Sequence, residues 1–128
     1  MENLVKKGEK KEIYTRVKEA DTARVYGSGL LDVYSTPAMV ALMEKTSMEL
    51  VQPYLEEGYG TVGISLQIRH LKAVPIGQEI KCESSLINRE GNQLSFELKV
   101  LWGNDIIGDG THKRFIIDEK RFLSKLKK

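Results

Sequence analysis

The stretch STPAMVALMEKTSMELVQP, residues 35–53, decides the fold because its long apolar run has helical start and stop signals at its two ends. Thr36 followed by Pro37 is typical of a helix start. A threonine hydroxyl can accept a hydrogen bond from a free backbone N–H, and proline fits the first helical position. Pro53 marks the end of the segment. The pattern predicts a helix over about Pro37–Gln52, with Thr36 as its N-cap.

Glu44 lies in the middle of the apolar face of this predicted helix. The residues beside it at helical spacing are all apolar, namely Val40, Ala41, Met48 and Val51. A separate polar stripe of Lys45, Glu49 and Gln52 supplies a solvent face. The spacing therefore predicts a carboxylate on the dry side of the helix, which is an unusual place for a charge.

Twofold alternation of apolar and polar residues indicates strands in the rest of the chain. A connection, Asp21–Ser35, follows the first strand, and a short helical or frayed tail begins at Asp118. The predicted strands are Lys11–Lys18, the segment from Gly60 to His70, Ile80–Leu86, Leu94–Trp102 and Ile106–Ile117. Short turns join the last four strands and favour antiparallel pairing. One helix and one antiparallel sheet predict an α+β domain, with the helix packed on one sheet face.

Composition limits the classes of function. The 128 residues suit a single domain, 1–128, with a core over about 13–122. A net charge of +2 is too balanced to indicate a nucleic-acid partner. The single cysteine, Cys82, excludes an internal disulfide and is expected to be a structural thiol in a cytoplasmic protein. We expect no membrane span, no metal site and no cofactor, because the apolar runs are short and neither metal-ligand spacing nor a phosphate-binding loop is present.

His70 is the second unusual residue. It shares the strand face of Val62, Ile64, Leu66 and Ile68, which we expect to pack on the helix. Glu44 and His70 are therefore both predicted to point toward the helix–sheet interior, and buried ionisable groups cluster at functional sites. Taken singly, Glu44 and His70 each have an ordinary structural explanation. Thr36 also has one, as a simple helix cap. His112 is predicted to share a strand face with Gly110, Arg114 and Ile116, and this mixture of residue types does not indicate whether that face is buried.

The sequence resembles the hotdog-fold thioesterases, and among them the fluoroacetyl-CoA thioesterase-like group, over about Ile13–Phe122. The matching segments are STPAMVALME (35–44), PYLEEGYGTVG (53–63), His70 and IGDGTHKR (107–114). The steps of eight residues from Thr36 to Glu44 and 26 from Glu44 to His70 look like the family's spacing. The resemblance implies a hotdog fold, in which a five-stranded antiparallel sheet wraps around one long central helix.

The resemblance also implies a function and its residues. The expected activity is hydrolysis of a short- or medium-chain acyl-CoA thioester, with coenzyme A as part of the substrate. Thr36, Glu44 and His70 match the family's catalytic residues, and Gly63, Leu30 and Arg114 are the expected substrate-binding residues. Glu44 would attack the thioester carbonyl or activate a water, and both routes stay open. Leu30 and Leu31 stand where the fluoroacetyl enzyme has a phenylalanine-bearing lid, which favours a different small or medium acyl group.

The expected partners are the acyl-CoA and a second copy of the chain, as a homodimer or a tetramer built from dimers. Leu94–Trp102 has the most regular alternation and is a candidate for the strand at the dimer edge. Three alternatives remain: a hotdog protein that binds acyl-CoA or another small ligand without hydrolysing it, a hydratase-like enzyme, and a dimerisation module. A hydratase would need an aspartate–histidine pair near the helix start, which the sequence lacks.

Overall fold

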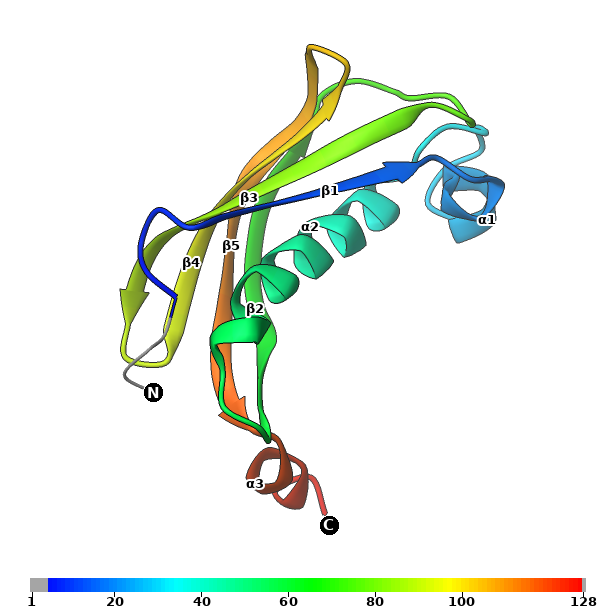
Figure 1. Ribbon diagram of the computed structural model, residues 1–128. Helices are drawn as coiled ribbons and strands as arrows, with labels where there is room; N and C mark the ends of the chain where they lie inside the picture. Colours follow the sequence, from blue (N-terminus) through cyan, green and yellow to red (C-terminus); the bar gives the residue numbers. More distant parts are fainter. Residues whose placement is uncertain (1–4, 128) are drawn as a thin grey trace.

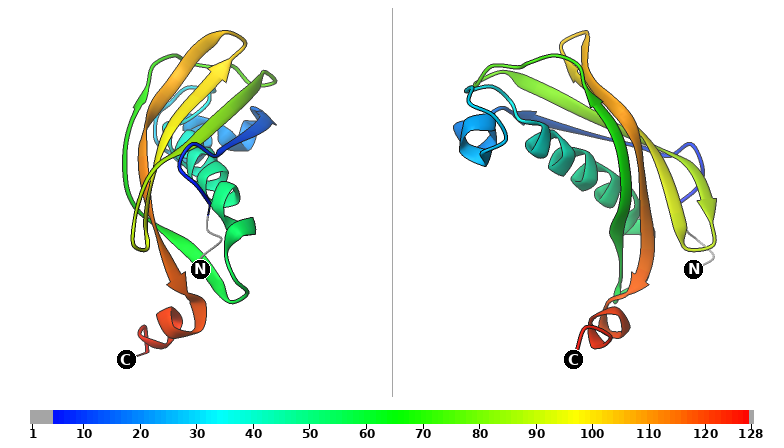
Figure 2. Two further views of the ribbon diagram at one scale, coloured as in Figure 1. Left: turned by 60° about the vertical axis from the view of Figure 1, so that its left-hand side comes forward. Right: turned by 180° about the vertical axis from the view of Figure 1, so that it is seen from behind.

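A computed structural model describes residues 5–127 as one curved antiparallel sheet around one long helix. The strands are β1 (Lys10–Arg16), β2 (Tyr59–His70), β3 (Glu79–Glu90), β4 (Gln93–Trp102) and β5 (Asp105–Asp118). The helices are α1 (Ala23–Tyr26), α2 (Thr36–Val51) and α3 (Glu119–Ser124), with 3₁₀ turns at Glu19–Asp21 and Gln52–Tyr54. Figures 1 and 2 show the sheet curving around α2, as predicted for a hotdog fold.

The strand order across the sheet is β1-β3-β4-β5-β2, and every pair is antiparallel. The hairpins β3–β4 and β4–β5 agree with the predicted short turns. β2 and β3 do not pair, because the segment 71–78 carries the chain from one edge of the sheet to the other side (Figure 1). The candidate edge strand Leu94–Trp102 was therefore wrong, since β4 lies inside the sheet and β1 and β2 form its edges.

The start of α2 differs by one residue from the prediction. Ser35, not Thr36, is the N-cap, and its hydroxyl accepts a hydrogen bond from the backbone N–H of Ala38 at 3.1 Å. Thr36 is the first helical residue and Pro37 the second. This shift releases the Thr36 hydroxyl from capping and leaves it available for a tertiary contact.

Helix α2 buries a different face from the one the sequence suggested. It packs mainly against β3 and β1, and its buried residues are Ala38, Met39, Leu42, Met43, Thr46, Ser47, Leu50 and Val51. Val40, Glu44 and Met48 are half-buried and Ala41 is exposed, so the Glu44 face is only partly dry within one chain. The single β2 face predicted for Val62, Ile64, Leu66, Ile68 and His70 is also wrong, because a bulge at Ile64 shifts the register of the strand. Val62 pairs with exposed Phe115, whereas Leu66 pairs with buried His112 on the other face, and Ile64 itself is 50% exposed.

Candidate active site

The first part of the site lies at the start of α2. Thr36 Oγ1 is 2.8 Å from Nδ1 of His70, the last residue of β2, so the helix start and the strand end meet through these two side chains. The ring of Tyr34 lies edge-on to the imidazole, with 6.2 Å between ring centroids. This edge contact and the hydrogen bond hold the imidazole in one orientation.

Burial lowers the pKa of His70, and the nearby backbone of Lys72 offsets this effect only in part. Nε2 of the ring is buried without a hydrogen bond of good geometry in the described part of the chain. His70 is therefore a neutral imidazole near pH 7, which suits a group that accepts or passes on a proton. An open cavity of about 300 Å³ borders it, with Ser28, Thr36 and Lys72 among its lining residues.

The second part of the site lies farther along α2, where Glu44 faces the middle of β2. A β-carbon added at Gly63 would be 2.8 Å from Glu44 Oε2, so the carboxylate rests against the bare backbone of this glycine. Gly63 begins a bulge in β2, because it pairs with Arg114 while Ser65 pairs with Lys113 and Ile64 is left over. The missing side chain and the bulge together make room for the carboxylate at the strand.

Arg114 supplies the positive charge beside this carboxylate. Its guanidinium Nη1 lies 3.8 Å from Glu44 Oε2, and its side chain is 8% exposed while that of Glu44 is 40% exposed. Thr61 anchors the guanidinium from β2: Nε donates to the Thr61 hydroxyl at 2.7 Å and Nη2 donates to the Thr61 carbonyl at 3.0 Å. Burial lowers the pKa of Arg114 and Glu44 opposes that effect.

The predicted site residues thus form two groups in one chain. Thr36 with His70 is one, and Glu44 with Gly63 and Arg114 is the other. The step from Thr36 to Glu44 is eight residues of helix, about 12 Å along the axis, and the step from Gly63 to His70 is seven residues of strand, about 23 Å. Leu30 is 91% exposed in the loop before α2, outside both groups.

Sequence reasoning missed His112. Its ring is 1% exposed and lies beside Gly63 and Arg114, with Nε2 3.1 Å from Arg114 Nη1. The twofold spacing of His112, Arg114 and Ile116 was the available signal, and in the structure these three are buried while Lys113 and Phe115 are exposed. It was weak because a histidine and an arginine do not by themselves mark the inner face of a strand.

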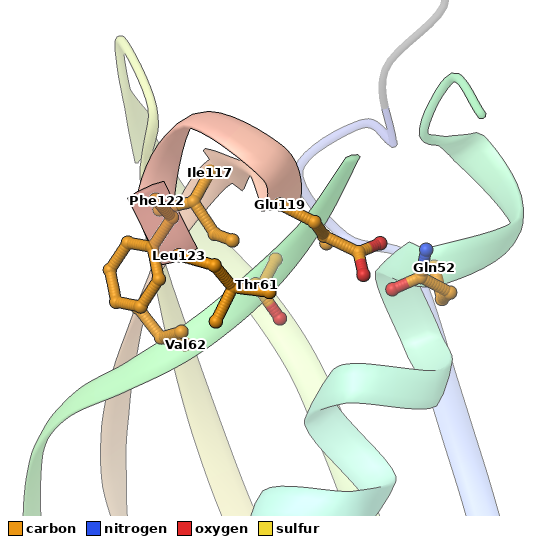
Figure 3. A pocket seen from close by; sticks show the side chains of 8 residues that line it. Gln52, Thr61, Val62, Ile117, Glu119, Phe122 and Leu123 are labelled. Carbon is orange, nitrogen blue, oxygen red and sulfur yellow. The ribbon is translucent and has the colours of Figure 1, made fainter. Parts of the chain in front are cut away.

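A separate cavity of about 340 Å³ lies outside both groups, between the end of α2, β2 and α3. Figure 3 shows Phe122, Leu123 and Val62 on its apolar side and Gln52 with Glu119 across from them. In the described residues, no cluster of three or more side chains suited to metal binding occurs. No helix in this part of the chain is long and apolar enough to cross a membrane.

Comparisons with known proteins agree with the fold and identify the family. The sequence family described as fluoroacetyl-CoA-specific thioesterase matches residues 17–120. The fluoroacetyl-CoA thioesterase of Streptantibioticus cattleyicolor is 35% identical over 96 residues, which are 75% of this chain and 69% of that protein. A solved structure of a fluoroacetyl-CoA thioesterase superposes with a TM-score of 0.90 at 31% identity and covers 95% of both chains. A thioesterase superfamily member from Thermus thermophilus gives 0.87 at 25% identity, over 94% of this chain and 90% of its own.

Proposed function

The chain belongs to the fluoroacetyl-CoA-specific thioesterase family and is a thioester hydrolase of the hotdog fold, and on that premise we propose which residues act and on what. Its proposed substrate is a short- or medium-chain acyl-CoA. The observation that carries the proposal is the Glu44 carboxylate, held 3.8 Å from a buried guanidinium and against the bare backbone of Gly63.

This arrangement suits attack on a thioester carbonyl. Glu44 provides the reacting carboxylate, either as the nucleophile or as the base that takes a proton from water. The Gly63 backbone N–H and a free N–H of Arg114 are donors for the oxygen on which negative charge develops. No cofactor is needed, since the thiolate of coenzyme A is itself a good leaving group.

Thr36 and His70 complete the proposed site from a second copy of the chain. They cannot reach the Glu44 carboxylate of their own chain, because Thr36 is too far from Glu44 along α2 and His70 is too far from Gly63 along β2. A homodimer in which two β2 edges pair antiparallel would run the strands in opposite directions. The His70 end of one β2 would then lie toward the Gly63 segment of the other, and a twofold axis would form two such sites.

Three features of the single chain support this dimer. β2 is an edge strand with unpaired backbone groups, which invite pairing with another strand. Ile64 projects from this strand with half of its surface exposed. The Glu44 face of α2 keeps apolar neighbours that the chain itself does not fully cover, namely Val40, Ala41 and Met48. A second subunit over β2 would account for all three.

The acyl group is proposed to be small or medium rather than fluoroacetyl alone. The cavity beside Thr36 and His70 has about 300 Å³ and opens toward the loop that carries Leu30 and Leu31. These exposed leucines are proposed to cover the acyl chain once the dimer and substrate are in place. The buried thiol of Cys82 is in keeping with the proposed cytoplasmic location.

Release of free CoA from a panel of acyl-CoA thioesters tests this function. The wild type is expected to hydrolyse at least one member with two to eight acyl carbons, and Glu44→Gln to lose at least roughly a hundredfold in kcat. Glu49→Gln is the matched control, because Glu49 lies on the same helix and its only ion pair within residues 5–127 is with Lys45, across 4.0 Å. Binding of acyl-CoA by the wild type without thiol release would instead favour the non-catalytic alternative.

A further inference from the structure

His112 is a buried imidazole that the proposed chemistry does not use. It lies on β5 with 1% of its surface exposed, and its ring stacks on Phe96 with 6.0 Å between centroids. Its two nitrogens face two different groups. Nδ1 is 2.9 Å from the backbone carbonyl of Ser65, and Nε2 is 3.1 Å from Nη1 of Arg114.

These two partners fix the position of the ring proton. A carbonyl only accepts, so Nδ1 must carry the hydrogen. A guanidinium only donates, so Nε2 must be the bare acceptor. Both contacts thus require the same neutral tautomer. Burial lowers the pKa of His112, the Ser65 carbonyl opposes this, and the charge of Arg114 lowers the pKa further. A protonated ring would carry a hydrogen on Nε2, and this N–H would then face the N–H donor of Arg114.

The hydrogen bonds of Arg114 show what this acceptor does. A guanidinium has five N–H groups. Two donate to Thr61 from Nε and Nη2, and one donates from Nη1 to His112. In the described part of the chain, one N–H on each terminal nitrogen is left without a hydrogen bond. Nη1 is also the nitrogen that lies 3.8 Å from Glu44 and 3.4 Å from a β-carbon placed at Gly63.

We propose that His112 is a positioning residue for the proposed thioesterase site, on whose function this inference rests. As a neutral acceptor it holds one edge of the Arg114 guanidinium while Thr61 holds the other. The remaining N–H of Nη1 is thereby aimed at the Glu44 carboxylate and the space above Gly63. In this role His112 acts through Arg114 and offers no N–H of its own to that space, although its Cε1 borders it, 3.2 Å from a β-carbon placed at Gly63.

Two amide variants separate this role from simple packing. In His112→Gln, the side-chain oxygen reaches the place of Nε2 and can still accept from Arg114. In His112→Asn, the amide reaches only the place of Nδ1 and keeps the Ser65 bond alone. Both remove the same stack on Phe96, so each is the other's packing control, and thermal unfolding checks that both are folded.

The kinetic result expected is a split between the two variants. His112→Gln should keep kcat within a few-fold of the wild type, while His112→Asn should lose roughly tenfold to a hundredfold in kcat with little change in KM, as expected when a reacting group is misplaced. Equal kcat values in two folded variants would overturn the inference.

A spectroscopic measurement tests the contact itself. The ¹⁵N shifts of the His112 ring in the wild type should show a neutral ring with its proton on Nδ1 at pH 7. Arg114→Met keeps the length of the stem but removes the donor, so the ¹⁵N shift of Nε2 should move as this nitrogen loses its hydrogen bond, while the Ser65 carbonyl keeps the proton on Nδ1. A proton on Nε2 in the wild type, with hydrolysis intact, would overturn the inference alone. The expected tautomer without hydrolysis of any thioester would overturn the proposed function.

Discussion

A methyl group on Gly63 would come within 2.8 Å of Glu44 Oε2, closer than a carbon and an oxygen can approach without one of them moving. The atom that would yield is the tip of a flexible side chain, so the conflict displaces the carboxylate rather than the strand. Gly63 does not adopt a positive φ, so its backbone conformation does not require a glycine. The close approach of the Glu44 carboxylate is what leaves no room for a side chain at this position.

Gly63→Ala should leave the protein folded and lower hydrolysis by roughly tenfold to a hundredfold, because a carboxylate displaced by about 1 Å no longer meets its substrate correctly. Gly60→Ala is the matched control on the same strand, where the added carbon would meet its nearest atom at 3.6 Å. Steady-state CoA release and circular dichroism measure the two effects. An active Gly63→Ala enzyme would show that the carboxylate is not tied to this position.

Hydrolysis should depend on the neutral form of His70. Because burial lowers the pKa of this imidazole, the ring is neutral above its usual value of 6.5 and gains a proton only at more acid pH. The kcat/KM of the wild type should therefore be level above pH 6.5 and fall as the pH drops below it. His70→Gln should lose most of the rate together with this acid limb. An unchanged profile in His70→Gln would remove His70 from the mechanism.

The hydroxyl of Thr36 should matter through its hydrogen bond to His70 and not through capping. Thr36→Val keeps the shape of the side chain and leaves the Ser35 cap intact. Its stability should stay near that of the wild type while its kcat falls, and Thr36→Ser should retain most of the activity. Wild-type kcat in folded Thr36→Val would contradict this assignment.

Much of the fold follows from local patterns, but the order of the strands does not. The hairpins β3–β4 and β4–β5 have short turns and regular alternation, and both were predicted correctly. The segment 71–78 resembles another such turn, with Pro75 and Gly77, yet it crosses over instead of closing a hairpin. The length of the segment and its turn residues do not distinguish a crossover from a hairpin, because the outcome depends on which strands pair elsewhere in the sheet.

The site illustrates the same limit at the level of single residues. Ser35 and Thr36 are both good caps, and only the imidazole 34 residues away decides which hydroxyl is left free. The face of Glu44 was predicted as dry because its helical neighbours are apolar. In one chain those neighbours are partly exposed, since the apolar stripe is wider than the sheet covers. Helical periodicity shows that a face is apolar, but it does not identify the element or subunit that covers that face.

The pH dependence of stability should carry a contribution from His112. Its pKa is lowered in the folded protein, so below pH 6.5 the unfolded chain takes up a proton that the native ring resists. Stability is lost as the pH falls. Urea unfolding at pH 7.5 and pH 5.5 should show a larger loss for the wild type than for His112→Gln. Equal losses in the two proteins would mean that the native ring protonates freely.

The open edge of β2 should be the site of dimerisation. Ile64→Lys places a charge where the second subunit is proposed to lie, and it should convert the dimer to a species of 14.5 kDa with little activity. Ile106→Lys is the control, because Ile106 is also an exposed isoleucine, 40% accessible, but it pairs with Leu101 of β4 beside the β4–β5 turn, before β5 begins to pair with β2. Sedimentation at micromolar concentration distinguishes the two. A dimeric Ile64→Lys protein would place the interface elsewhere.

Mixing two inactive variants tests whether the site is shared between subunits. In a dimer of one Glu44→Gln chain and one His70→Ala chain, one site receives both substitutions and the other receives neither, provided that Glu44 acts with the partner subunit's His70. Random exchange makes half of the dimers mixed, so activity should return to about a quarter of the wild-type value. If Glu44 and His70 of the same chain worked together, every site would carry one defect and no activity would return. Native mass spectrometry of chains with tags of different mass confirms the exchange, so that continued inactivity of the mixture would rule out the shared site.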